Sequence, residues 1–143
     1  MWPRNQPRHP VESPPALLAV LSNPGERKLI ADLSHDNGWN LTVAENLEQA
    51  RSRIADKRLA VVLLDRDLAE SDWRSMVRSF TSLHPAPCVI LASSVSDHYL
   101  FEELVNQGGY DVVAKPLKLE EVRRITRLAL TFWKNRPLRD SIG

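Results

Sequence analysis

The sequence has little that would tie the chain together covalently or hold it in a membrane. It contains one cysteine, Cys88, among 143 residues, so no disulfide can form within the chain. Cys88 lies in an apolar run, and we expect a small buried hydrophobe there rather than a reactive thiol or a metal ligand. The longest apolar runs, 16–21 and 59–64, are far shorter than the roughly 20 residues that span a bilayer. The first ten residues also lack the apolar centre of a secretory signal, so we expect a soluble, cytoplasmic protein with a hydrophobic core.

The chain also has few glycines and almost no net charge, which argues against a glycine-rich phosphate-binding loop and against general binding to nucleic acid or membranes. Gly25 is isolated in the sequence, and no glycine-rich loop is present to cradle a phosphate. The 19 basic and 18 acidic side chains nearly cancel, to a net charge of +1, and give no general attraction to nucleic acid or to a membrane surface. The serines lack the G-x-S-x-G setting of a hydrolase, and His35, His84 and His98 have no second ligand at zinc spacing.

Proline is concentrated at the start of the chain, where half of the ten prolines lie within residues 1–15. Few apolar side chains accompany them, which predicts a disordered, proline-rich arm. A leader without function and a docking peptide, which Trp2 would favour, are the two interpretations of this arm. The sequence predicts one domain over residues 16–134 and a short tail over 135–143.

From Ala16 onward, short aliphatic runs alternate with longer stretches of helical periodicity. Most of the runs lack polar alternation, which favours strands buried on both faces. The predicted strands are 16–21, 40–44, 59–65, 87–92 and 109–114. The stretches between them carry apolar residues three or four apart: Leu29, Ile30 and Leu33; Leu47, Ala50 and Ile54; Trp73, Met76, Val77 and Phe80; Leu100, Phe101, Leu104 and Val105; Leu119, Val122, Ile125, Leu128, Ala129 and Phe132.

Local signals mark where several of these helices begin and end. Asn46 and Ser96 are typical N-cap residues, and Gly38 and Gly108 fall where helices are expected to end. Five strands alternating with five helices predict right-handed crossovers and a parallel sheet between two layers of helices. Such a sheet presents its functional site at the carboxyl ends of its strands.

Two charged residues are predicted to meet at those carboxyl ends. Asp65 directly follows an apolar run, so its carboxylate should lie half desolvated at the end of a central strand. Lys115 closes the last predicted strand and is the natural cation to pair with it. Pro116 follows Lys115 and cannot donate a strand hydrogen bond, which turns the chain there.

These features, taken in order, make residues 16–134 resemble a receiver domain of the bacterial response-regulator family. The matching segments are Val61-Val62-Leu63-Leu64-Asp65-Arg66-Asp67-Leu68, Pro87-Cys88-Val89-Ile90-Leu91, Gly109-Tyr110-Asp111, Lys115-Pro116-Leu117, and Pro24 with Arg27. The resemblance implies a flavodoxin-like (CheY-like) five-stranded parallel sheet, in the order 2-1-3-4-5, with helices on both faces. It also implies that Asp65 accepts a phosphoryl group from a histidine kinase, that Lys115 contacts the phosphoryl oxygens, and that the backbone carbonyl of Asp67 helps to hold Mg²⁺.

The sequence departs from this family where the metal should bind. Receivers normally carry an acidic pair after the first strand, and here Leu21 and Ser22 stand at those places. Mg²⁺ prefers oxygen ligands that include one or two carboxylates, so the loss of the pair predicts weakened binding. Asp65, Asp67 and Asn23 are the remaining candidate ligands, with Glu26 within reach from the next turn, and no Mg²⁺ site is assured.

The switch residues of the family are altered as well. The hydroxyl residue at the end of the fourth strand corresponds to Ala92, or to Ser93 if the register shifts by one, and its aromatic partner corresponds to Val112. In typical receivers, phosphorylation draws the hydroxyl toward the phosphate and lets the ring turn inward. Ala92 and Val112 cannot do this. Tyr110 should lie on the same face as Val112 at a different depth, so we do not expect it to substitute.

The last predicted helix carries Arg123, Arg124, Arg127 and Lys134 beside its apolar stripe. A solvated basic face is one interpretation. The other is a docking or homodimer surface formed by the fourth helix, fifth strand and fifth helix, as in other receivers, with Phe132 and Trp133 as aromatic anchors. The nine residues after Lys134 leave no room for a helix-turn-helix output domain, so we expect no nucleic-acid binding.

Three functional hypotheses follow from this pattern. The first is an atypical receiver that acts mainly through protein contacts. The alternative is a conventional receiver that is phosphorylated at Asp65 by a histidine kinase with Mg²⁺; self-catalysed phosphoryl transfer to Asp65 is the only enzymatic activity expected. A flavodoxin-like ligand binder would share the sheet but would need a phosphate-cradling loop, and the sequence has none.

Overall fold

The computed structural model describes residues 15–54, 58–68, 72–95 and 97–136. The predicted arm, apart from Pro15, and the predicted tail, apart from Asn135 and Arg136, lie outside these residues. No helix in the described part of the chain is long and apolar enough to cross a membrane.

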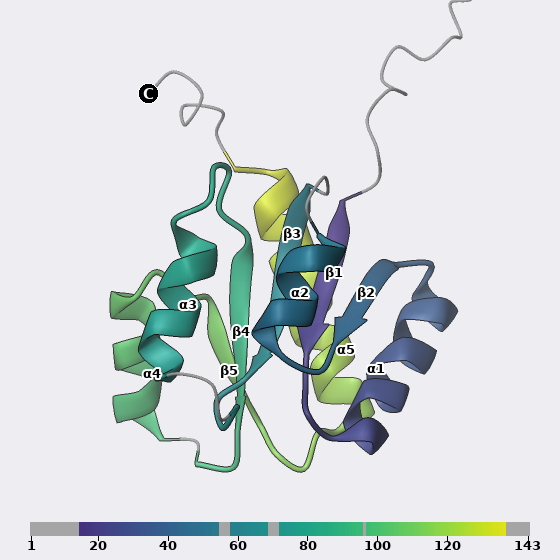
Figure 1. The fold of residues 1–143 in the computed structure, drawn as a ribbon, viewed down its shortest axis with the longest axis horizontal. Coiled ribbons are helices and arrows are strands. Elements are labelled where there is room, and N and C mark those ends of the chain that lie inside the picture. The colour runs from purple at the N-terminus through teal and green to yellow at the C-terminus, as the bar shows by residue number, and fades with distance from the viewer. Residues whose placement is uncertain (1–14, 55–57, 69–71, 96, 137–143) are drawn as a thin grey trace, which may run out of the picture.

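The described residues form a parallel sheet of five strands with five helices, as the alternation of the sequence predicts. The strands are β1 (Ala16–Val20), β2 (Asn40–Ala44), β3 (Leu59–Asp65), β4 (Cys88–Ser93) and β5 (Asp111–Ala114). The helices are α1 (Pro24–Asn37), α2 (Leu47–Arg53), α3 (Trp73–Thr81), α4 (His98–Asn106) and α5 (Leu119–Lys134). The strand order β2-β1-β3-β4-β5 confirms the flavodoxin-like topology (Figure 1).

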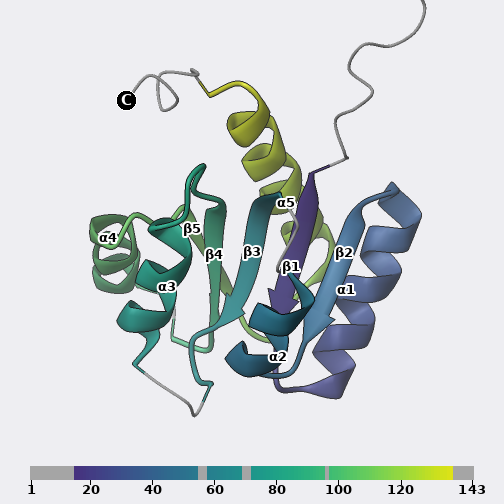
Figure 2. The ribbon, with the colours of Figure 1, turned by 45° about the horizontal axis from the view of Figure 1, so that its top comes forward.

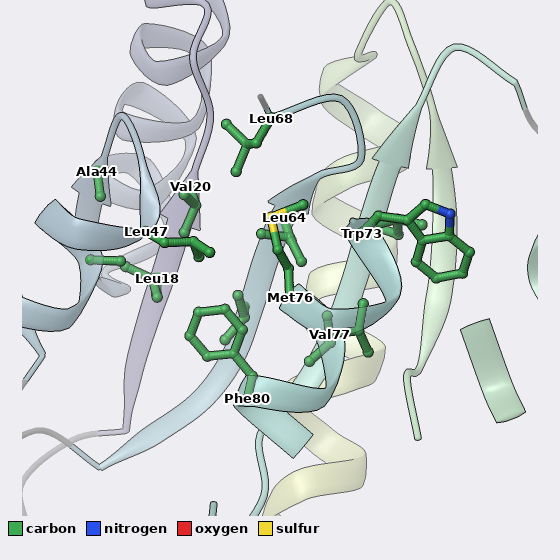
Figure 3. Packing of buried hydrophobic residues seen from close by; sticks show 14 of the residues in the cluster. Leu18, Val20, Ala44, Leu47, Leu64, Leu68, Trp73, Met76, Val77 and Phe80 are labelled. Carbon is green, nitrogen blue, oxygen red and sulfur yellow. The ribbon is translucent and has the colours of Figure 1, made fainter. Parts of the chain in front are cut away.

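Two hydrophobic clusters lie on the two faces of the sheet. One lies under α2, α3 and α4, where Leu18 and Leu64 contribute from the strands and Met76 and Phe80 from α3 (Figure 3). The other lies between the sheet and the pair α1 and α5. Figure 2 shows α2 and α3 in front of the sheet and α5 behind it. Because β3 is central and covered on both faces, all seven of its residues are buried, which explains its unbroken aliphatic run.

The helix boundaries follow side-chain and glycine signals, with one correction. Asn46 accepts a hydrogen bond from the backbone of Gln49 at 2.9 Å, as predicted. Gly38 has φ 68°, a left-handed conformation that favours glycine after a helix. The expectation that Ser96 caps α4 is wrong: Asp97 is the N-cap, and its carboxylate accepts from the backbone of Leu100 at 3.0 Å. Ser96 itself lies outside the described residues.

Strand ends and apolar stripes also differ in detail from the expectations. Leu21, Pro87, Gly109 and Tyr110 lie outside the strands, whereas Ser93 belongs to β4.

The buried stripes of α4 and α5 are narrower than predicted. In α4, Leu100 and Leu104 are buried but Phe101 and Val105 are exposed. In α5, Trp133 is buried, and the exposed residues are Leu119, Leu128 and Phe132. Each helix buries only the stripe that faces the sheet, and residues one position round the helix point away from it.

Candidate functional site

Asp65 occupies the centre of the carboxyl edge of the sheet. It is the last residue of β3, which lies between β1 and β4, and it is only 2% exposed. A carboxylate this deep requires compensating donors. Its Oδ2 accepts a hydrogen bond from Lys115 Nζ at 2.9 Å, and its Oδ1 accepts from the backbone N–H of Asp67 at 2.9 Å. The contact with Lys115 that the strand ends predict is therefore present.

Lys115 is positioned by the end of β5. Its backbone N–H donates to the carbonyl of Ser93 at 2.9 Å, which extends the β4–β5 pairing by one residue to the lysine. Burial alone lowers the pKa of the Lys115 ammonium. The hydrogen bond and charge of Asp65, with smaller contributions from Glu26, outweigh burial, so the pKa stays above the ordinary lysine value and the group remains charged at neutral pH.

Glu26 is a second carboxylate at this ammonium. Its Oε1 lies 3.5 Å from Lys115 Nζ, and its side chain is only 17% exposed. The start of α1 places it there, because Asn23 caps the helix by accepting from the backbone N–H of Glu26 at 3.1 Å. The sequence signal was an acidic residue in the first turn of a helix that begins at the carboxyl edge of the sheet. That signal placed Glu26 within reach and did not show which group it would contact.

The positions that replace the acidic pair offer no carboxylate. Leu21 is fully buried, and its backbone carbonyl accepts from Arg27 Nη1 at 2.8 Å, so this oxygen already faces a cation. Ser22 is exposed. Asn23 uses its side-chain oxygen for the cap of α1, and the carboxylate of Asp67 is half exposed and lies 3.5 Å from Arg66 Nη1.

The residues present do not fit a Mg²⁺ site of the usual receiver kind. Among the described residues, no group of three or more histidine, cysteine, aspartate or glutamate side chains is arranged to hold a metal. The two carboxylates that do meet, Asp65 and Glu26, both face the ammonium of Lys115. The structure does not bring Asn23 and Asp67 side chains into this cluster as ligands.

Strand register shows which residue of β4 lies beside Asp65. Ala92 pairs with Asp65 across β3 and β4, so it is the residue beside the aspartate. Ser93 lies one residue further on, fully buried, and its hydroxyl accepts from the backbone N–H of Val95 at 3.0 Å. A methyl group thus stands beside Asp65, and the nearby hydroxyl is engaged by its own loop.

The expectation that Tyr110 shares a face with Val112 is wrong. Val112 packs against the cluster under α2, α3 and α4, whereas Tyr110 packs against the cluster under α1 and α5. Tyr110 precedes β5, so the alternation of side chains within the strand does not extend to it. Its ring lies 5.7 Å from that of Phe132, a distance that joins the start of β5 to α5.

A parallel α/β sheet whose central strand ends in a buried aspartate, paired with a lysine that directly follows the edge strand, is typical of a receiver-type signalling domain. The comparison with protein families agrees, since the response regulator receiver domain matches residues 18–127. The chain therefore belongs to the receiver domain family of two-component response regulators.

Similar proteins come from several bacteria. A putative NtrX-like response regulator of Rickettsia bellii is 32% identical over 101 residues, which are 67% of this chain and 20% of that protein. The transcriptional regulatory protein KdpE of Staphylococcus aureus is 26% identical over 90 residues, which are 63% of this chain and 38% of KdpE. The chain thus spans well under half the length of these relatives.

Solved structures share the fold at lower sequence identity. The signal receiver domain of an HD domain-containing protein from Pseudomonas fluorescens superposes with a TM-score of 0.77 at 22% identity, covering 87% of this chain and 100% of that one. The receiver domain of NtrX from Brucella abortus superposes with a TM-score of 0.71 at 24% identity, covering 81% and 98%. Both likenesses concern the fold.

Proposed function

We propose that this chain is an atypical receiver that transmits its signal mainly through protein contacts, with Asp65 phosphorylated inefficiently or not at all. The observation that carries this proposal is the ion cluster at the strand ends. Lys115 lies between Asp65 and Glu26, while Leu21 and Ser22 leave the usual place of the acidic pair without a carboxylate.

The chemistry of phosphoryl transfer explains why this matters. A carboxylate oxygen of Asp65 would attack phosphorus in line while the donor's P–N or P–O bond breaks. Because charge neutralisation and positioning do nearly all the catalytic work, the cation that screens the phosphoryl oxygens sets the rate. Mg²⁺ would supply that screening when bound. Here Lys115 is the cation at Asp65, and a single ammonium neutralises less charge than an ammonium with a divalent ion.

The alternative is a conventional receiver that a histidine kinase phosphorylates at Asp65 with Mg²⁺. The 2.9 Å contact between Lys115 and Asp65 favours it, because the resemblance gives both residues direct roles in the transfer. The residues at the two predicted switch positions argue against a conventional receiver. With Ala92 beside Asp65 and Val112 in β5, a phosphoryl group would find no hydroxyl at the first position and no aromatic ring at the second.

A surface for protein contacts lies on the two helices that border β5. Tyr99, Phe101 and Val105 of α4 and Leu128 and Phe132 of α5 are all at least 42% exposed. Exposed aromatic side chains are typical anchors in interfaces. Trp133 cannot serve as the second aromatic anchor, because it is only 6% exposed and packs in the core. We propose that this α4–β5–α5 face binds a histidine kinase, another signalling protein or a second copy of the chain.

The basic residues of α5 contribute less to this surface than their number indicates. Arg127 donates to the side chain of Asn37 at 2.8 Å, and Arg123 pairs with Glu120 on its own helix. These contacts support the solvated-face interpretation for both arginines. The chain offers no reason in its charge to bind nucleic acid.

Beryllofluoride, which mimics a phosphoryl group on a receiver aspartate with Mg²⁺ present, tests the proposal. The titration is followed by the amide NMR signals of Ala92 and Lys115, with Asp65→Asn as the matched control. We expect no saturable shift in the parent protein. Saturable shifts that vanish in Asp65→Asn would support the conventional receiver instead.

A further inference from the structure

Lys115, Glu26 and Asp65 form a compact ionic triad at the carboxyl edge of the sheet. The ammonium lies 2.9 Å from Asp65 Oδ2 and 3.5 Å from Glu26 Oε1. The side chains are 18%, 17% and 3% exposed, so water screens these contacts less than it screens surface pairs. Glu26 lies in α1, Asp65 ends β3 and Lys115 directly follows β5, so segments distant in the sequence meet here.

Glu26 depends on Lys115 for its compensation. Its Oε1 is buried and has no hydrogen-bond partner within the described residues, so the nearby ammonium is the charge that offsets it. The neighbouring cation, Arg27, points elsewhere. Its Nη1 donates to the carbonyl of Leu21 and its Nη2 lies 3.9 Å from Glu45.

The oxygen atoms around the triad that could bind a metal already accept hydrogen bonds from the protein. Asp65 Oδ1 accepts from Asp67, the carbonyl of Leu21 accepts from Arg27, and the amide oxygen of Asn23 accepts from Glu26. A divalent cation entering here would have to displace the Lys115 ammonium from both carboxylates. Two carboxylates and one ammonium give the triad a net charge of −1. A third carboxylate beside the same ammonium would make this charge −2.

We infer that Lys115 is the resident cation of this site: Glu26 replaces the missing acidic pair by holding the ammonium, and Lys115 competes with divalent metal for the carboxylates of Asp65 and Glu26. The inference rests on the proposed function for the location of the site and deepens it. It assigns Glu26 as a positioning residue for Lys115. It also adds a second reason for poor metal binding, which is an occupied cation position, to the missing carboxylates at Leu21 and Ser22.

The test is Mn²⁺ binding, measured from the loss of the electron paramagnetic resonance signal of the free ion. It compares the parent protein, Lys115→Gln, and the double variant Lys115→Gln with Glu26→Gln. Glutamine retains an amide donor for Asp65. Lys28→Met is the matched control, because Lys28 also pairs with a carboxylate, Asp32 at 3.0 Å, on the exposed side of the same helix as Glu26.

We expect no saturable Mn²⁺ binding by the parent or by Lys28→Met. Lys115→Gln should bind with a Kd at least about tenfold below the weakest Kd that the measurement detects, since supporting groups alter metal sites on that scale, and the double variant should lose this binding. Equal binding by the parent and Lys115→Gln would overturn the competition, and binding retained in the double variant would overturn the role of Glu26.

Circular dichroism confirms that each variant is folded before binding is scored. Should Lys115→Gln fail to fold, saturable Mn²⁺ binding by the parent alone, with paramagnetic broadening centred on the amides of Asp65 and Asp67, would still contradict it, and absence of such broadening would support it. No phosphoryl donor is present, so this result is independent of whether Asp65 accepts phosphate.

Discussion

Glu26 Oε1 and Lys115 Nζ lie 3.5 Å apart at the carboxyl edge of the sheet; Glu26 is in the first turn of α1, and Lys115 directly follows β5. This contact brings a carboxylate to that edge from a helix rather than from the turn after β1. It gives Lys115 a second partner beside Asp65. The attraction of Asp65 and Glu26 for the Lys115 ammonium should therefore affect both stability and metal binding.

Replacing Lys115 by methionine should destabilise the fold. The substitution leaves Asp65, 3% exposed at its side chain, without the ammonium that compensates its charge. Removing one partner of a buried pair costs about 3–5 kcal/mol, and the partial exposure of Lys115 places the expected loss near the lower end of that range. Urea unfolding measures it. Lys28→Met, in an exposed pair, should change the stability by less than about 0.5 kcal/mol.

The raised pKa of Lys115 predicts a loss of stability in alkali. The folded state holds this proton more tightly than the unfolded chain, in which a lysine has a pKa of about 10.4. The contribution is therefore complete below that pH and is lost as the pH rises through the folded pKa. Unfolding free energy measured above about pH 10 should fall more steeply in the parent than in Lys115→Gln. Parallel curves would show that the triad does not stabilise the fold.

Cys88 should react slowly with thiol reagents in the native protein. It is 5% exposed, its Sγ donates to the carbonyl of Ala129 at 3.6 Å, and burial raises its pKa to about 11 although the charge of Arg136 lowers it somewhat. Both access and thiolate fraction are therefore low near neutral pH. Reaction with a chromogenic disulfide should become rapid only in denaturant. A native rate close to the unfolded rate would contradict this burial.

Phe132 and Trp133 are neighbours in sequence, but their replacement should affect the free energy of unfolding very differently. Trp133→Ala removes a core side chain and should cost about 3–5 kcal/mol in unfolding free energy. Phe132→Ala and Phe101→Ala, at exposed positions, should change stability by less than about 0.5 kcal/mol and weaken self-association in sedimentation measurements. A parent that stays monomeric at all concentrations would contradict the homodimer proposal.

Much of the fold and the central pair could be predicted because they depend on local pattern. The unbroken aliphatic run of β3 predicts a central strand. Because Asp65 directly follows this run, it is predicted at the carboxyl edge of the sheet. Lys115 follows by the same argument from β5. Parallel strands bring these ends together whatever the details of the helices.

What the sequence did not settle depends on side-chain direction in three dimensions. Whether Glu26 would reach Lys115 depends on how α1 leaves β1, which the cap at Asn23 decides. The sequence pattern puts Tyr110 on the wrong face, because β5 begins one residue after it. The pattern also predicts Trp133 at the surface with Phe132, but in α5 Trp133 faces the core and Phe132 faces away from it.

Phosphoryl transfer to Asp65 is measured most directly from the intact mass of the protein after incubation with acetyl phosphate and Mg²⁺. Asp65→Asn is the negative control, and Ser22→Asp, which returns a carboxylate at an exposed position of the missing pair, is the positive one. We predict little or no phosphoryl adduct in the parent and more in Ser22→Asp. A stoichiometric adduct in the parent that disappears in Asp65→Asn would contradict it.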